Sequence, residues 1–342
     1  MNEKSSRGQF YTTNSHIIFK YFEVPPGRTV IEPFAGAGDL IKNLDNPLEL
    51  YDISPPNQDL GSEEKIQIRD TLLNPPDYAG KFIITNPPYL AKNKNKCPAN
   101  KDIYEKYRVD DLYKAFLKTL MLAPLNLEGI IIIPVNFWTS GILTEFMKYF
   151  KITLSLIFEY PLFTDTTAAV TVFHFVSRVF QNDHFEAIDT VFLQLGGEEV
   201  RRAIKFPLFT KLTNYIIPEH IVVARLTKQV ANTRINIHCI DNTTQKIRAY
   251  LGEPHRDTTP KLSERTVLNL VITIHGRTMV SVNKNAEEVF VKRFNNYLAA
   301  KREKYNSMFL TNYRETNRKR ISFEQVFKIA AIVLAGMIKY KK

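Results

Sequence analysis

A glycine-rich turn directly after a short β-branched run is the feature that most constrains the fold of this chain. Residues 29–32 are Thr-Val-Ile-Glu, and Gly36 and Gly38 follow soon after. Glycines after a first strand let the backbone pass close to a ligand and turn into a helix, which we expect from about Asp39. The dinucleotide pattern GxGxxG is not completed, because position 41 is Ile. The turn therefore suits a smaller nucleoside ligand better than a pyrophosphate.

The first half of the chain alternates β-branched runs with helical or loop segments, which is typical of an α/β sheet. After the first strand, further strands are expected at residues 48–51, 65–68, 81–85, 129–134, 154–158 and 168–176. Residues 129–134 are continuously apolar, as expected for a strand covered on both faces. Apolar residues at helical spacing predict helices at 110–123, 286–305 and 322–340. These patterns predict an α/β, Rossmann-like sheet in the first half.

The charge of +11 is unevenly distributed along the chain. Residues 185–342 hold 27 Lys and Arg against 14 Asp and Glu, whereas residues 1–184 hold 19 against 21. A near-neutral half joined to a basic half suggests a catalytic domain, 1–183, followed by a polyanion-binding domain, 184–342, part of which folds back onto the first. A basic surface that serves only solubility is the alternative interpretation.

Composition limits the class of protein. The chain has 342 residues, 44% of them hydrophobic and 24% charged, as in soluble globular proteins. Cys97 and Cys239 are too few for a disulfide framework and lie in no metal-ligand cluster, so we expect a reducing compartment and no metal site. The N-terminus shows no signal peptide, and the apolar stretch 326–338 is too short to cross a bilayer. We expect a cytoplasmic protein, in a bacterial or virus-infected cell, without a membrane partner.

Two acidic residues follow the next two predicted strands. Asp52 comes after the second strand, where a carboxylate can accept hydrogen bonds from ribose hydroxyls. Asp70 comes after the third strand, placed to accept a donor from an adenine edge. Ligands of open α/β sheets bind at the carboxyl ends of the strands, so these acids and the glycine turn predict one nucleoside site.

The most specific motif is Asn86-Pro87-Pro88-Tyr89, at the end of the fourth predicted strand. The N6 lone pair of adenine is delocalised into the ring, so the amine is a poor nucleophile. Two acceptors aimed at its protons, the Asn86 side-chain oxygen and the Pro87 carbonyl, can localise that pair. Successive prolines restrict the backbone and preorganise the carbonyl. Tyr89 offers a face on which an extruded base can stack.

These motifs together resemble those of N6-adenine DNA methyltransferases of type II restriction-modification systems. The catalytic motif of that family matches residues 86–89, and its FxGxG motif matches Phe34, Gly36 and Gly38. The cofactor motif precedes the catalytic motif and the basic half follows, which is the gamma order. The segments 90–95 and 102–113 also resemble those of enzymes that modify CATG.

The resemblance implies the cofactor S-adenosyl-L-methionine and a set of residues that bind it. Those residues are Gln9, Tyr11, Thr12, Glu32, Pro33, Phe34, Ala35, Gly36, Gly38, Asp52, Ile53, Asp70, Thr71 and Asn86. It implies catalytic roles for residues 86–89 and a second aromatic, Phe163, against the target base. Thr71 departs from the Asp-Phe pairing that is common in the family, so the apolar wall beside the adenine is expected from Leu72, Pro88 or Phe116.

Double-stranded DNA is the implied partner, and a cognate restriction endonuclease would be functionally linked. Basic residues after the catalytic motif and in the second half are candidates for phosphate contacts: Lys92, Lys94, Lys101, Arg108, Arg201, Arg202, Arg318, Lys319 and Arg320. Tyr104 and Tyr107, which lie among the first of these, are expected to stack on bases.

Three other functions remain open at this point. The same motif serves enzymes that methylate adenine in RNA and enzymes that methylate a glutamine side chain in protein release factors. About twenty-eight residues precede the first strand, too few for the helical domain expected of a glutamine methylase. A DNA-binding subunit with an inactive cofactor fold is the alternative that is not an enzyme.

Overall fold

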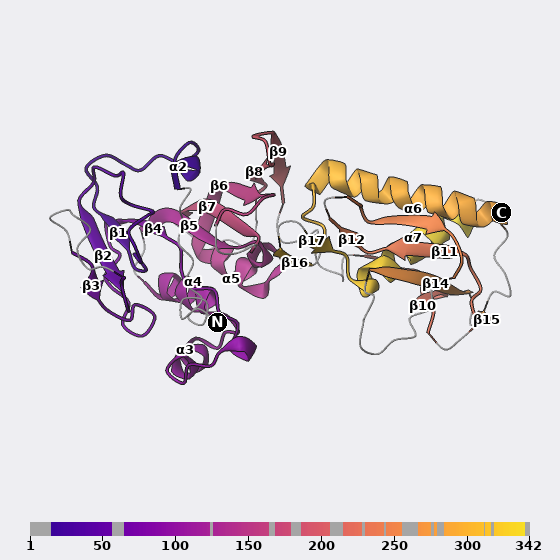
Figure 1. Cartoon of the computed structure of the whole chain (residues 1–342), viewed down its shortest axis with the longest axis horizontal. Coiled ribbons are helices and arrows are strands. Elements are labelled where there is room, and N and C mark those ends of the chain that lie inside the picture. The colour runs from indigo at the N-terminus through magenta and orange to yellow at the C-terminus, as the bar shows by residue number, and fades with distance from the viewer. Residues whose placement is uncertain are drawn as a thin grey trace. The chain divides into compact units, whose positions relative to one another are not determined.

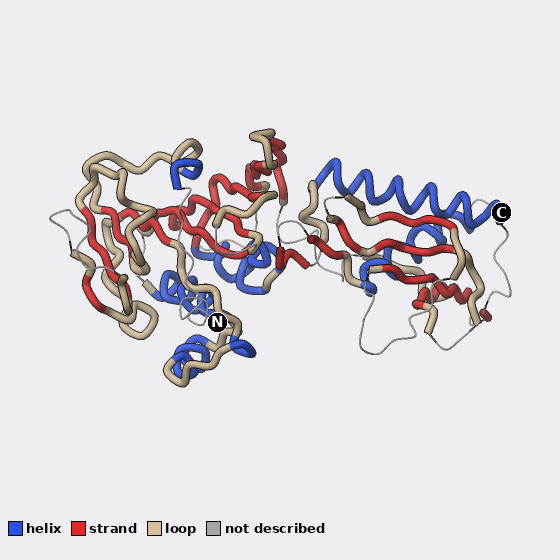
Figure 2. Tube along the Cα trace, viewed as in Figure 1, coloured by secondary structure: helices blue, strands red, loops and turns tan. Residues whose placement is uncertain are grey.

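A computed structural model of the chain falls into two compact units, Met1–Phe206 and Pro207–Lys342 (Figure 1). It describes residues 15–56, 65–123, 126–163, 168–178, 186–205, 215–227, 230–242, 244–254, 266–274, 277–278, 284–310, 312–315 and 318–338. Figure 2 shows that strands form the interior of each unit and that helices lie against them.

The first unit is built on a nine-stranded sheet with the order β3-β2-β1-β4-β5-β7-β6-β8-β9. The strands are β1 (Val30–Glu32), β2 (Leu48–Asp52), β3 (Gln67–Ile68), β4 (Phe82–Thr85), β5 (Glu128–Pro134), β6 (Phe150–Phe158), β7 (Val170–Ser177), β8 (Ile188–Leu193) and β9 (Glu199–Ile204). The first five are parallel to one another, and β7 runs antiparallel between β5 and β6. This order confirms the predicted Rossmann-like α/β class, with each of the predicted strands present.

The described part of this unit also contains helices and single helical turns. They are α2 (Ser15–Ile18), α3 (Asn100–Tyr107), α4 (Leu112–Leu122) and α5 (Gly141–Tyr149), with single turns η1 (Lys92–Lys94) and η2 (Val135–Thr139). The prediction of a helix after the glycine turn is wrong, because residues 39–43 form turns only. Only residues 44–47 separate these turns from β2, and the conformation required before Pro47 disfavours helix at Asn46.

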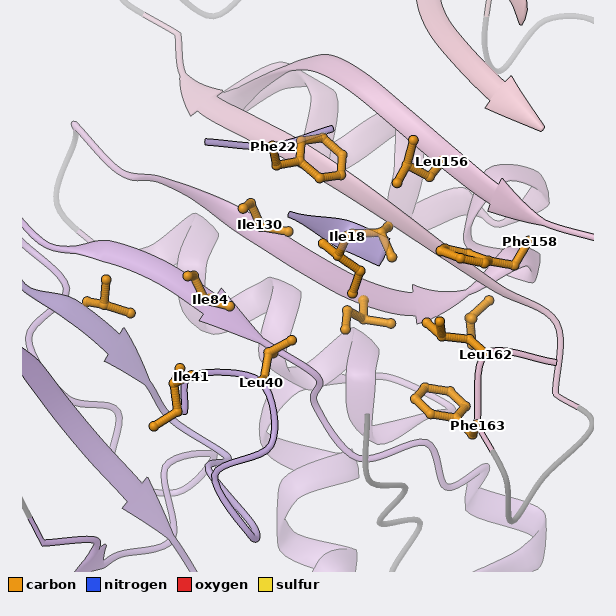
Figure 3. Close-up of a cluster of buried hydrophobic side chains, with 14 of the residues drawn as sticks. Ile18, Phe22, Leu40, Ile41, Ile84, Ile130, Leu156, Phe158, Leu162 and Phe163 are labelled. Atoms are coloured by element: carbon orange, nitrogen blue, oxygen red, sulfur yellow. The ribbon is translucent and has the colours of Figure 1, made fainter. Parts of the chain in front are cut away.

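A hydrophobic cluster packs on one face of the sheet (Figure 3). Ile18 and Phe22 from the N-terminal segment pack there with Ile84, Ile130 and Leu156 from three strands, and all five side chains are buried. Full burial of such a side chain contributes about 1.5–3 kcal/mol. The cluster therefore holds the N-terminal segment on the strands that carry the site.

The opposite face packs against aromatic side chains from η2 and α5. Phe173 of β7 lies beside Ile131 of β5 and stacks on Phe137, with ring centroids 5.2 Å apart. Phe146 of α5 meets Phe173 edge to face at 5.8 Å. Both faces of β5 are therefore covered, as its continuous apolar run predicts.

Gly129 of β5 pairs with Ile83 of β4. A Cβ atom added there would lie 2.2 Å from the carbonyl oxygen of Ile83, which is backbone and cannot rotate away. Only glycine lets the two strands pair at this position. The residue between Glu128 and the isoleucine run is thus required by the sheet.

Replacing this glycine should destabilise the first unit. Gly129→Ala is expected to lower the free energy of unfolding by about 2 kcal/mol, because β5 must shift away from β4. Denaturant unfolding followed by circular dichroism measures the change. Gly141→Ala is the matched control, because a Cβ there meets nothing within 4 Å. Equal stability of the two variants would contradict the close contact.

The boundary between the units lies later than the predicted 183/184. β8 pairs in parallel with β6, and β9 pairs with β8, so residues 188–204 complete the first sheet. Arg201 and Arg202 therefore belong to the edge strand β9 of the first unit, not to a separate basic domain. The boundary falls between Phe206 and Pro207.

The second unit combines two smaller sheets with two helices. One sheet has the order β10-β14-β11-β13, with β15 pairing to β14, and the other has the order β12-β17-β16. The elements are β10 (Ile221–Arg225), β11 (Ile235–His238), β12 (Ile240–Asp241), β13 (Arg248–Leu251), β14 (Val267–Ile274), β15 (Arg277–Thr278), α6 (Lys284–Tyr305), β16 (Asn312–Glu315), β17 (Arg318–Arg320) and α7 (Phe323–Ile338). The two helices predicted here are confirmed.

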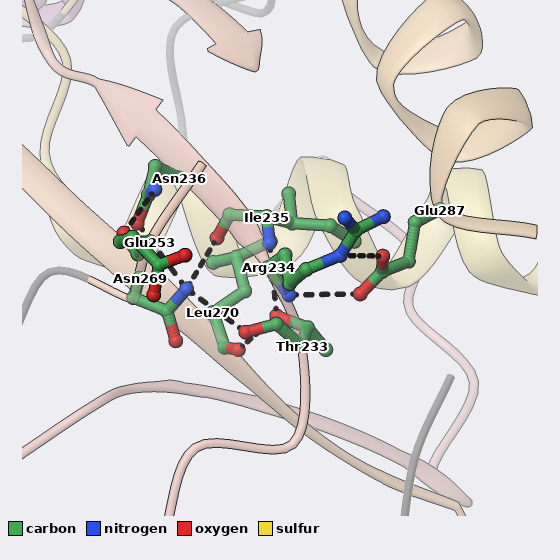
Figure 4. Close-up of polar contacts among 8 residues, drawn as sticks. All are labelled: Thr233, Arg234, Ile235, Asn236, Glu253, Asn269, Leu270 and Glu287. Carbon is green, nitrogen blue, oxygen red and sulfur yellow. Dashed lines mark hydrogen bonds and ion pairs between the residues drawn. The ribbon is translucent and has the colours of Figure 1, made fainter. Parts of the chain in front are cut away.

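A buried polar network attaches α6 to the sheet of this unit (Figure 4). The carboxylate of Glu287 accepts hydrogen bonds from the backbone N–H of Arg234, at 2.8 Å, and from its guanidinium, at 3.1 Å. Asn269 donates to the carbonyl oxygens of Thr233 and Ile235. These bonds satisfy backbone groups at the start of β11, which would otherwise be buried without partners.

No helix within the described ranges combines the length and the apolarity that crossing a bilayer requires.

Candidate nucleoside and methyl-acceptor site

A cavity of about 370 Å³ lies at the carboxyl ends of the parallel strands. Its lining comes from the loops after β1, β2, β3 and β4 and from the segment around α3: Phe34, Gly36, Asp52, Ile53, Ser54, Arg69, Asp70, Thr71, Leu72, Asn86, Pro88, Cys97, Ala99, Asn100, Ile103 and Leu112. The volume is in the range of small-molecule sites. The structure thus brings the three predicted loops together.

The glycine turn is held by backbone bonds to β2. Gly36 and Gly38 have φ angles of 54° and 77°, which L-residues with side chains rarely adopt. The N–H of Ala35 donates to the carbonyl oxygen of Tyr51 at 2.7 Å, and the N–H of Gly36 donates to Asp52 Oδ2 at 3.0 Å. The positive φ angles therefore favour glycine at both positions, and Gly36 lines the cavity.

Asp52 is oriented from both sides. Its Oδ2 accepts from Gly36, and its Oδ1 accepts from the N–H of Ser54 at 2.7 Å. The side chain is buried, yet it lines the cavity. A carboxylate oxygen has a second lone pair, so each oxygen retains capacity for a ligand hydroxyl.

Asp70 and Thr71, in the loop after β3, make different hydrogen bonds. Asp70 Oδ1 accepts the N–H groups of Leu72 and Leu73, both at 3.0 Å, and the residue lines the cavity. Thr71 donates to the carbonyl oxygen of Pro33 at 2.9 Å. The threonine, which stands where the resembled family has an aromatic residue, ties this loop to the glycine turn.

The apolar wall of the cavity comes from several elements. Leu72 and Pro88 contribute to it, as expected, together with Ile103 and Leu112. Phe116 is not part of the lining. Its ring supports Phe34 edge to face at 5.3 Å from behind the cavity.

Asn86 and Pro88 face the cavity, whereas Tyr89 packs against the hydrophobic cluster. The Tyr89 hydroxyl donates to Asn86 Oδ1 and lies 2.8 Å from the carbonyl oxygen of Ile132. Its ring meets Tyr113 edge to face at 6.4 Å. Burial raises the pKa of Tyr89 well above its ordinary value, so the hydroxyl stays protonated and can donate.

Glu32 lies under the site and does not line it. Its Oε1 accepts from the N–H of Phe34 at 3.0 Å and from the Thr85 hydroxyl at 2.6 Å. Burial raises the pKa of this carboxyl to about 8, although both hydrogen bonds favour the charged form. The residue links the ends of β1 and β4, the two strands that precede the glycine turn and the catalytic motif.

Glu32 should make stability depend on pH. Because its folded-state pKa is about 8, the folded chain keeps a proton that the unfolded chain has released above its ordinary value of 4.5. The free energy of unfolding should therefore fall as pH rises between these values. Glu32→Gln has no titratable group at this position, so its thermal midpoint should depend less on pH over this window. Glu23→Gln, at an exposed glutamate, is the control, and identical profiles for the two variants would contradict the burial effect.

Some of the remaining predicted site residues have a described position, and others lie outside the described residues. Ile53 lines the cavity, and Gly38 donates its N–H to the carbonyl oxygen of Ala35 at 2.8 Å. Gln9, Tyr11 and Thr12 lie outside the described residues. Phe163 belongs to the hydrophobic cluster and is 3% exposed.

The segment around α3 differs from its predicted role. Tyr104 and Tyr107 are buried, and their hydroxyls bond to backbone carbonyls, so they are not free to stack on bases. Sequence reasoning missed Cys97, Asn100 and Ile103 as lining residues, since the lysines of this segment pointed to phosphate contacts only. The apolar face of α3 was the available signal.

Most of the predicted phosphate-binding residues are at the surface. Exposed side chains among them are Lys92, Lys94, Lys101, Arg108, Arg201 and Arg318, and partly buried ones are Arg202 and Arg320. The predicted phosphate contact of Lys319 is wrong. This lysine is buried, donates to Ser307 Oγ at 3.1 Å, and has a pKa lowered by burial to about 7. Neighbouring residues on β17 face opposite sides, so Lys319 points inward where Arg318 points out.

No protein-family model and no curated protein matches the chain. A solved structure from Vibrio vulnificus, described as the modification subunit of a type I restriction enzyme, has 14% identity and a TM-score of 0.42, covering 55% of this chain and 48% of that chain. A protein from Listeria monocytogenes, described as a class I S-adenosylmethionine-dependent methyltransferase, has 12% identity and a TM-score of 0.41, covering 54% and 63%.

A third structure is the type I restriction-modification methyltransferase subunit from Streptococcus thermophilus. It has 16% identity and a TM-score of 0.37, and the match covers 55% of this chain and 48% of that chain. The matched part spans less than two thirds of each of the three proteins. The fold class of this chain rests on the strand order of its own sheet.

Proposed function

We propose that this chain is a site-specific DNA methyltransferase that transfers a methyl group from S-adenosyl-L-methionine to N6 of adenine, within a type II restriction-modification system. The observation that carries the proposal is that Asn86 of the catalytic motif and the carboxylates of Asp52 and Asp70 line one cavity. An acceptor for the target amine thus lies beside acceptors for a nucleoside cofactor.

The residues of the cavity fit such a cofactor. Asp52 has acceptor capacity for the ribose hydroxyls, and Asp70 for an adenine amino group, while Phe34 and Leu72 supply apolar contact. When bound, S-adenosyl-L-methionine supplies a methyl group already activated on a sulfonium. The reaction needs alignment and no nucleophilic cysteine or serine.

The catalytic motif would act on the adenine amine. The Asn86 oxygen and the Pro87 carbonyl accept its protons and localise the nitrogen lone pair. In the structure Asn86 Oδ1 accepts the Tyr89 hydroxyl, and an amide oxygen can accept more than one hydrogen bond. Tyr89 and Phe163 are the proposed ring partners of an extruded base. Phe163 is 3% exposed, so entry of the base has to open this packing.

The basic residues of the first unit are proposed to hold the DNA backbone, and the unit 207–342 is proposed to read the target sequence. The resemblance favours CATG as that sequence. The exposed lysines of η1 follow the catalytic motif directly. A DNA strand held there would place a flipped base near Asn86.

Asn86 should contribute far more to turnover than to cofactor binding, although it lines the cofactor cavity. Asn86→Ala is expected to lower kcat by about 10²–10³ because one transition-state acceptor is lost. The dissociation constant for S-adenosyl-L-methionine, measured by calorimetry, should stay within about twofold. Asp70→Ala is the complementary variant and should weaken cofactor binding by about tenfold, the effect of a charge-assisted hydrogen bond. Wild-type turnover in Asn86→Ala would overturn the proposed acceptor role.

The salt dependence of DNA binding tests the basic surface. Lys92→Ala and Lys94→Ala should each reduce the slope of log affinity against log salt by about 0.9, if each lysine neutralises one phosphate. Lys151→Ala is the control. This lysine is also exposed, but it lies on β6 near the opposite, amino-terminal end of the strands, where it pairs with Glu186 at 3.0 Å. Equal slopes for all three variants would contradict the assignment.

The substrate class has its own test. Purified protein with labelled S-adenosyl-L-methionine should methylate duplex DNA and leave RNA and a protein release factor unlabelled. Sequencing of DNA from expressing cells, with detection of N6-methyladenine in context, should show one short motif. Labelling of RNA or of the release factor in place of DNA would assign the site to that substrate instead.

A further inference from the structure

Helix α3 joins two loops of the site that are far apart in sequence. The helix covers Asn100–Tyr107, and its buried side chains are Ile103, Tyr104 and Tyr107. Ile103 lines the cavity. The two tyrosines point their hydroxyls at two different loops.

Tyr104 holds the residue that follows the catalytic motif. Its hydroxyl donates to the carbonyl oxygen of Leu90 at 2.7 Å. That carbonyl also accepts the N–H of Leu112 at 3.2 Å, and the N–H of Leu90 donates to Asp111 Oδ1 at 3.0 Å. Both backbone groups of Leu90 are therefore bonded, and the end of the turn formed by residues 86–89 is anchored to α3 and α4.

Tyr107 holds the loop that carries Asp70. Its hydroxyl donates to the carbonyl oxygen of Leu72 at 2.7 Å, and the Lys106 ammonium donates to the carbonyl oxygen of Leu73 at 2.9 Å. The N–H groups of Leu72 and Leu73 in turn donate to Asp70 Oδ1. The orientation of the Asp70 carboxylate is thus linked to α3 through the two leucines.

The hydroxyl bonds of Tyr104 and Tyr107 connect α3 to two segments that are separated in the sequence. Leu90 is 18 residues after Leu72 in the chain, yet one helical turn of α3 bonds to both. Burial raises the pKa of Tyr104 above its ordinary value, so its hydroxyl remains a donor at neutral and alkaline pH. A buried hydroxyl bonded to a backbone carbonyl holds that carbonyl in one place.

We propose that α3 is a brace that sets the distance between the methyl-acceptor turn and the nucleoside-binding loop, with Tyr104 and Tyr107 as separate positioning residues. Tyr104 positions the turn that ends at Tyr89, and Tyr107 positions Asp70. The consequences for catalysis rest on the proposed function, whereas the brace itself does not.

Tyr104→Phe and Tyr107→Phe test the brace, because each removes one hydroxyl and keeps the ring in the core. Amide hydrogen exchange on the full-length protein is the first measurement. Tyr104→Phe should speed exchange in residues 90–92 by roughly 3- to 10-fold, the effect of one lost hydrogen bond, and leave residues 72–74 unchanged. Tyr107→Phe should speed exchange in residues 72–74 by a similar factor and leave residues 90–92 unchanged.

Kinetics and calorimetry on the same proteins are the second measurement. Tyr104→Phe should lower kcat for duplex DNA by roughly 3- to 10-fold with cofactor affinity within about twofold. Tyr107→Phe should weaken S-adenosyl-L-methionine binding by a similar factor and leave kcat at saturation within about twofold. Tyr21→Phe is the matched control, since it loses a hydroxyl bond to Glu199 outside the cavity.

The outcomes separate the two proposals. If the wild-type protein methylates no DNA, the proposed function fails, and hydrogen exchange still decides on the brace. If both tyrosine variants change exchange in both loops equally, or in neither relative to Tyr21→Phe, the brace is overturned. A fall in kcat and in cofactor affinity together in both variants would also overturn the separate roles, since it would indicate a general loosening of the unit.

Discussion

Parallel pairing of β1 with β2 on one side and β4 on the other is the constraint on which the site depends. Val30 pairs with Leu48 and with Phe82, so the three strands run in the same direction from nearly the same level. Their carboxyl ends must then lie at one edge of the sheet. The glycine turn, Asp52 and Asn86 follow these three ends, and their convergence is a consequence of strand direction.

Hydrogen bonds from buried side chains fix the positions of these converging loops. Glu32 connects the ends of β1 and β4, and Thr71 connects the loop after β3 to the glycine turn. Tyr104 and Tyr107 extend the same principle to the segment after the catalytic motif. Each of these groups bonds to backbone or to another buried side chain, so the loops are held without relying on regular secondary structure.

The buried acids Glu32, Glu287 and Asp241 have different partners. In the first unit, Glu32 is buried with hydrogen bonds and pairs with no cation among the described residues, so burial favours its neutral form. In the second unit, Arg234 pairs with Glu287, and Arg302 makes two contacts with Asp241, at 2.7 Å and 2.9 Å. Pairing compensates the desolvation of those charges and holds α6 against the strands of its own unit.

Sequence alone determined the α/β class, the strand that precedes each motif and the four loops after β1, β2, β3 and β4 that line the cavity. Periodicity and motif spacing are local properties, so the strands, the long C-terminal helices and the positions of Asp52, Asp70 and Asn86 were predictable. Only the tertiary structure decided where β8 and β9 pair, which tyrosines are internal and that Lys319 faces inward. Those outcomes depend on which surface a distant segment covers. Composition indicates neither that segment nor the direction in which a side chain points.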